Sequence, residues 1–77
     1  MEITKEKEQE FLLRVGANIK TIRKARKMSM EGLGLEVGLT RMHINRIEKG
    51  YNITLKTILR LAVALDIEPS VILKQID

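Results

Sequence analysis

The chain of 77 residues has no cysteine and no tryptophan, and Phe11 and Tyr51 are its only aromatic residues. Without cysteine it can form no disulfide and no thiolate metal site. Because aromatic residues are so few, its core must be aliphatic. His43 is the only histidine, and a single imidazole neither holds a metal nor performs hydrolysis without partners. No paired carboxylates flank a cleft-forming segment either. We therefore expect no enzyme, no cofactor and no metal site.

Long apolar runs are also lacking, so the sequence predicts no membrane span. The first six residues, Met-Glu-Ile-Thr-Lys-Glu, are too charged for a signal peptide. Together with the absence of cysteine, this favours a cytoplasmic protein. The length allows one domain, near the lower limit for a single core, and leaves no room for a separate ligand-binding domain.

The net charge of +4 is unevenly distributed. Residues 19–60 hold ten basic and three acidic side chains, a net +7, whereas the segments before and after them are net negative. A basic middle segment is what a phosphate-facing surface requires. A solvated basic face on a soluble helix would give the same charge pattern, so charge alone does not decide between the two.

Residues 30–48 have the pattern of two short helices joined by a tight turn. Leu33 and Val37 are four residues apart and share the inner face of the first helix. Gly38 can adopt the positive φ that ends a helix, and Thr40 can cap the next one. Gly34 lies where we expect the two helices to cross.

The second helix of this pair has one apolar face, formed by Ile44 and Ile47. Its remaining side chains point away from that face: Arg41, Met42, His43, Asn45 and Arg46. An outward polar face free to enter a DNA groove is typical of a helix-turn-helix. The alternative is a helical hairpin that only packs within its own domain.

This stretch resembles the helix-turn-helix of the phage-repressor and Cro-like (Xre-type) family, and the resemblance covers about residues 15–73. It implies an all-α, compact five-helix bundle of the lambda-repressor-like DNA-binding type. It also implies a sequence-specific, DNA-binding transcriptional regulator. By resemblance the base-reading positions are Arg41, Met42 and Arg46, flanked by His43 and Asn45. Either arginine could instead bind phosphate only.

Phosphates should be met by helix N-termini, loop amides and nearby lysines. The candidates are Ser29, Thr40, Lys49, Tyr51, Asn52, Thr54 and Lys56. The sequence departs from the family at Met30, where a glutamine usually binds the DNA backbone. Gly32, and Ile53 in place of a frequent proline, are two further departures.

Three more helices complete the expected bundle. The first has a core-facing stripe of Phe11, Val15, Ile19 and Ile22, beside which Gly16 marks a close contact. Residues 1–10 are a flexible charged arm or an extension of that helix, and residues 11–77 form the domain. Thr54 caps a fourth helix, for which the inward residues are Leu55, Ile58, Leu59, Ala62 and Leu65.

Pro69 suits the first turn of a fifth helix, on which Ile72 points inward. Its other apolar residues exceed what a small domain can bury. We therefore expect a homodimer interface at Ile67, Val71 and Ile76, because a single recognition helix contacts too few base pairs. Two half-sites would lie about 34 Å apart.

Arg23 and Glu48 both border the core, and two isolated buried charges would be costly. A bidentate pair solves this problem, and the family has an arginine and a glutamate at matching positions. We assign both residues to structure.

Among small proteins of this pattern, the chain resembles restriction–modification controller proteins and phage repressors. The alternative is an antitoxin that binds a toxin protein and its own promoter, for which only the N-terminal arm could wrap a partner. Double-stranded DNA is the expected partner, with RNA polymerase or a toxin as candidates for a further one.

Overall fold

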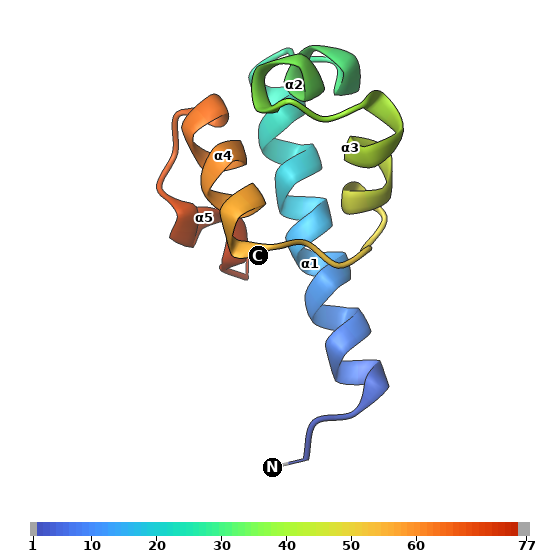
Figure 1. The fold of residues 1–77 in the computed structure, drawn as a ribbon. Coiled ribbons are helices and arrows are strands. Elements are labelled where there is room, and N and C mark those ends of the chain that lie inside the picture. The colour runs from blue at the N-terminus through green and yellow to red at the C-terminus, as the bar shows by residue number, and fades with distance from the viewer. Residues whose placement is uncertain (1, 76–77) are drawn as a thin grey trace.

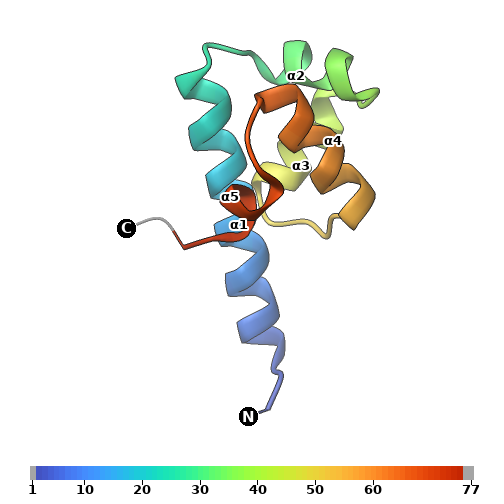
Figure 2. The same cartoon turned by 90° about the vertical axis from the view of Figure 1, so that its left-hand side faces the viewer.

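The computed structural model describes residues 2–75 and has five helices: α1 (Lys5–Ala25), α2 (Met30–Val37), α3 (Arg41–Glu48), α4 (Leu55–Leu65) and α5 (Pro69–Leu73). The second half of α1 lies among the other helices, and its first half projects beyond them (Figure 1). The view at right angles shows the same projection (Figure 2). The predicted all-α, five-helix fold is confirmed. Residues 5–10 belong to α1.

Four of the five described helices begin with the same hydroxyl cap. The side chains of Thr4, Ser29, Thr40 and Thr54 each accept a hydrogen bond from the backbone amide three residues further on, at 2.9–3.1 Å. Such a cap stabilises a helix by about 1 kcal/mol. The predicted starts of α2, α3 and α4 are therefore confirmed, and each follows from a residue visible in the sequence.

The turn between α2 and α3 depends on two glycines. Gly38 ends α2 with a left-handed φ of 75°, as predicted. A Cβ on Gly34 would collide with the carbonyl oxygen of Leu39, and the Leu39 amide donates to the Gly34 oxygen at 2.8 Å. We expected Gly34 to let the two helices cross, but its close contact is with the turn. The turn can thus fold back tightly against α2.

An aliphatic core fills the space between the helices, as the shortage of aromatic residues predicted. Its buried members are Val15, Ile19, Leu33, Val37, Ile44, Ile47, Ile58, Leu61, Ala62, Leu65 and Ile72. Fully burying a large aliphatic side chain contributes about 1.5–3 kcal/mol. Every described helix supplies at least one of these side chains, so the core holds all five together.

The predicted core was wrong at three positions and missed a fourth. Phe11, Leu55 and Leu59 are exposed, whereas Leu61 is completely buried. Apolar residues occur around most of α4, so periodicity alone could not identify its inner face. Phe11 lies on the first half of α1 and is 43% exposed, with the guanidinium of Arg14 over its ring, 5.1 Å from the ring centre.

One buried polar side chain joins the two ends of the domain. Asn18 donates through Nδ2 to the carbonyl oxygens of Ile72 at 2.8 Å and Lys74 at 2.6 Å. A helix of five residues such as α5 is not stable alone. Asn18 therefore fixes the end of α5 against α1. Sequence analysis missed it, although its position three residues after Val15 lies on the inward face.

Replacing Asn18 with alanine should reduce the free energy of unfolding by about 1–3 kcal/mol, because two carbonyls at the end of α5 lose their donor. Urea denaturation followed by circular dichroism measures the loss. Thr21→Ala, at an exposed position on the same helix, is the control. Equal stability of the two variants would show that the Asn18 bonds contribute nothing.

Candidate nucleic-acid interface

Helix α3 turns its polar side chains outward. Ile44 and Ile47 are buried beneath it. Of the five side chains predicted to read bases, Asn45 is half-buried and the other four are exposed: Arg41, Met42, His43 and Arg46. The structure therefore brings all five together on one helix.

The loop after α3 extends this surface. Arg46 and Tyr51 border two neighbouring shallow hollows, each of about 350 Å³. One is also lined by Thr40, His43 and Asn52, and the other by Arg41, Met42, Asn45 and Lys49. The Tyr51 amide donates to the Arg46 oxygen at 3.0 Å, which fixes the loop to the end of the helix. Four of the predicted phosphate-binding residues thus adjoin the predicted base-reading ones.

The remaining phosphate-binding candidates lie at other helix starts. Ser29 caps α2, while Thr54 caps α4 and Lys56 lies in the first turn of α4. All three are exposed. A side-chain cap satisfies one of the amides in the first turn and leaves others directed outward, where the helix dipole favours an anion. The starts of α2 and α4 therefore offer outward backbone amides of the kind that the phosphate prediction requires.

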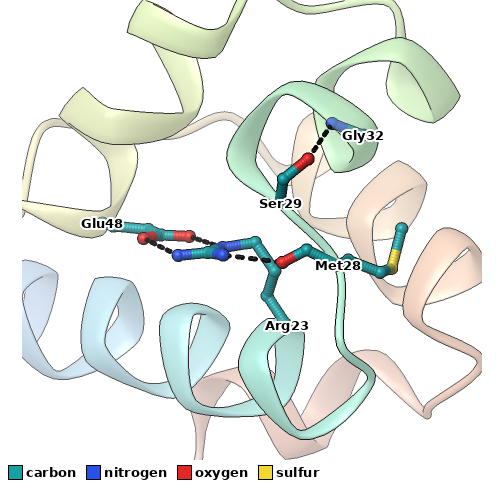
Figure 3. A network of polar contacts seen from close by, with 5 residues as sticks. All are labelled: Arg23, Met28, Ser29, Gly32 and Glu48. Atoms are coloured by element: carbon teal, nitrogen blue, oxygen red, sulfur yellow. Dashed lines mark hydrogen bonds and ion pairs between the residues drawn. The ribbon is translucent and has the colours of Figure 1, made fainter.

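An ion pair supports α3 from behind. Arg23 on α1 donates through Nε to Glu48 Oε2 at 2.6 Å and through Nη2 to Oε1 at 3.0 Å. Its Nη1 donates to the Met28 oxygen at 2.8 Å, so the same guanidinium also holds the segment that leads into α2 (Figure 3). The hydrogen bonds to Glu48 raise the pKa of Arg23 above its usual value.

Close backbone packing accompanies this pair. A Cβ on Gly16 of α1 would lie only 2.7 Å from the Glu48 oxygen and would collide with that of Ile47. The close contact predicted at Gly16 is confirmed, and it lets α1 pass directly under the end of α3. The ion pair and this contact together fix the position and direction of α3 relative to α1.

The described part of the chain has neither a cluster of metal ligands nor a membrane-spanning helix. Among residues 2–75, no three histidine, cysteine, aspartate or glutamate side chains gather so that they could hold a metal ion. Nor is any helix in that range long and apolar enough to cross a membrane.

A domain of five helices that fixes α3 behind a tight turn, with its polar face outward, is a helix-turn-helix DNA-binding domain. A sequence model of the helix-turn-helix family matches residues 19–72. The chain therefore belongs to this family, of the phage-repressor and Cro-like type, and is a DNA-binding transcription regulator.

Two solved structures are similar to the chain. One is the restriction-modification controller protein C.AhdI from Aeromonas hydrophila, with 39% identity over 79% of this chain and 94% of that one, and a TM-score of 0.77. The other is a hypothetical transcription factor, NHTF, from Neisseria, with 29% identity over 88% of this chain and 78% of that one, and a TM-score of 0.80. A comparison with curated proteins finds no match.

Removing either member of the Arg23–Glu48 pair should be severely destabilising. The two side chains are only 6% and 3% exposed, so Arg23→Ala and Glu48→Ala each leave an unpaired buried charge and should cost about 3–5 kcal/mol. The double variant should lose less than the sum of the two single losses. Chemical denaturation of all four proteins measures this coupling, and strictly additive losses would contradict it.

Proposed function

We propose that the chain is a homodimeric regulator of the controller type, which binds a two-fold symmetric site in duplex DNA. The observation that carries this proposal is the outward polar face of α3, which has two arginines on it and Lys49 at its C-terminal end. An α-helix fits the major groove of B-DNA, and side chains near its N-terminus reach the base edges first.

Arg41, Met42 and Arg46 are the proposed base-reading residues. An arginine can donate to guanine O6 and N7 together, which discriminates by about 1–3 kcal/mol against other bases. Met42 is 60% exposed and has no polar group, so it suits the methyl group of thymine. His43 and Asn45 flank these three on α3 and complete the proposed reading surface.

The proposed phosphate contacts surround that helix. The hydroxyls of Ser29, Thr40 and Thr54 each accept a hydrogen bond from a backbone amide of the helix that they cap. The other backbone amides at these helix starts, and nearby side chains, would therefore contact DNA. The side chains proposed for this role are Lys49, Tyr51, Asn52 and Lys56. The Oδ1 of Asn52 accepts from the Ile53 amide at 2.9 Å, which leaves its amide group to donate. Such contacts position the protein without reading sequence.

A homodimer would use the exposed apolar surface at the start of α4 and along the neighbouring α5. Leu55 and Leu59 on α4 are 80% and 55% exposed. Ile67 and Val71 are half-buried and so offer less surface, and Ile76 lies outside the described residues. Leu55 directly follows the loop proposed to bind phosphate. A partner at this surface would therefore lie beside the DNA, as two recognition helices in successive major grooves require.

Similarity to a restriction-modification controller protein supports the controller type. The antitoxin alternative relied on an N-terminal arm able to wrap a partner, but residues 5–10 of that arm continue α1. We therefore place DNA binding, and not toxin binding, first.

The DNA proposal is tested by selecting duplexes from a random pool with the wild-type protein and measuring affinity over a salt series. Affinity for a selected duplex should fall steeply as salt rises, because lysine and arginine contacts release counterions. Arg46→Ala should weaken the selected duplex more than a random one and leave the helical circular-dichroism signal unchanged.

Lys56→Ala is the matched variant, because it removes a proposed phosphate contact. It should weaken all duplexes by similar factors and reduce the salt slope by about one. Equal losses for selected and random DNA in Arg46→Ala would make Arg46 a phosphate contact. Failure of the wild-type protein to prefer any duplex would overturn sequence-specific binding.

The proposed dimer surface predicts that Leu55→Glu converts the protein to a monomer, because like charges would meet across the two-fold axis. Sedimentation at micromolar concentration measures the change, with Val71→Glu as the comparison. If Val71→Glu lost the dimer and Leu55→Glu kept it, the interface would lie on α5 and not on α4. A wild-type protein that is monomeric without DNA would leave only pairing on the DNA.

A further inference from the structure

We propose that the first half of α1 is a positioning element for the loop between α3 and α4, and thereby sets the affinity of the protein for DNA phosphate. Leu13 and Gln9 are the positioning residues. This inference rests on the proposed function, in which that loop binds phosphate. The residues concerned precede the segment 19–72 that matches the helix-turn-helix family.

Gly50 is where α1 and the loop meet. It is buried, and its φ of 94° is one that glycine adopts without strain. A Cβ built on Gly50 would lie 2.9 Å from Leu13 Cδ2 and 3.0 Å from Gln9 Nε2. Two side chains of α1 therefore occupy the space directly over the Gly50 backbone.

Hydrogen bonds at Gly50 and Tyr51 fix the direction in which the loop leaves α3. The Gly50 amide donates to the Ile47 oxygen at 3.1 Å, and the Tyr51 amide donates to the Arg46 oxygen at 3.0 Å. Tyr51 and Asn52, the proposed phosphate-binding side chains, come directly after Gly50. Any shift of Gly50 would therefore move both of them relative to α3.

Further along, the loop and α1 line a common hollow. It has a volume of about 490 Å³ and is bordered by α1, the loop, α4 and α5 together. From α1 it includes Glu8, Phe11, Leu12 and Val15, and from the loop it includes Asn52 and Ile53. The loop is thus in contact with the first half of α1 at Gly50 and faces it across this hollow at Asn52. In Figure 1 the loop crosses α1 where its projecting half begins.

The charge of this half gives no reason for a direct DNA contact. Residues 5–15 contain three glutamates, two lysines and one arginine, a net charge of zero. A segment without net charge does not attract phosphate and would not itself strengthen DNA binding. Its effect must come from holding the loop in place, because a loop that is already ordered loses less entropy when DNA binds.

The first measurement needs no DNA. In Leu13→Ala the amides of Gly50 and Tyr51 should exchange with solvent about three to ten times faster than in the wild type. With the apolar packing over Gly50 reduced, their hydrogen bonds to Ile47 and Arg46 should open more often. Gln9→Ala should show the same direction of change, and its exposed position leaves folding intact. Leu35→Ala, at a 78% exposed leucine on α2, is the matched control and should change neither amide.

The second measurement uses a duplex selected by the wild-type protein and an unselected duplex of equal length. Leu13→Ala should weaken binding to both by the same factor, about three- to tenfold, because phosphate contacts carry no sequence information. Leu13→Met, which keeps a flexible apolar side chain over Gly50, should restore both affinities.

Unchanged amide exchange in both Leu13→Ala and Gln9→Ala would overturn the positioning role. Faster exchange with unchanged affinity would overturn its link to DNA binding. A loss of affinity confined to the selected duplex would also overturn this link, because Leu13 would then affect the reading of bases and not the binding of phosphate. If the wild-type protein bound neither duplex, the proposed function itself would fail, whereas the exchange result would still decide whether α1 holds the loop.

Discussion

The ion pair between Arg23 and Glu48 is the interaction on which the proposed DNA-binding surface depends. The recognition helix has only eight residues, too few to be stable or correctly placed by itself. Its C-terminal end is fixed to α1 by two hydrogen bonds of the pair and by the close backbone approach at Gly16. The same guanidinium holds the Met28 carbonyl, so one side chain sets the recognition helix and the entry to α2 together.

The fold could be predicted largely because its local signals agree. Hydroxyl residues lie at the helix starts and a glycine at the turn, with inward aliphatic residues at helical spacing. Arg23 and Glu48 could be paired because the family they resemble has an arginine and a glutamate at matching positions. The cost of an isolated charge beside an apolar stripe pointed the same way. The outward positions on α3 followed from Ile44 and Ile47, which fix the inner face of that helix.

The sequence failed where local pattern carries no information. On α4 both faces are apolar, so Leu55 and Leu59 could not be distinguished from Leu61 before the position of α1 and α5 was known. The Asn18 bonds join residues 54 and 56 positions apart, and nothing near Asn18 indicates its acceptors. The packing of Leu13 over Gly50 was likewise invisible, because it depends on where a long helix crosses a loop. Distant contacts of this kind are decided by tertiary structure.

The Asn18 link between the first and last helices also governs how the protein is made. Helices form quickly from local contacts, so α1 to α4 can form before α5 is in place. The carbonyls that Asn18 binds belong to Ile72 and Lys74, which are synthesised after all four of those helices. A chain cut short before them has an unpaired buried amide and no side chain from Ile72 in its core. A product truncated before Ile72 should therefore be less stable, spend more time unfolded and be degraded faster than a chain that includes α5.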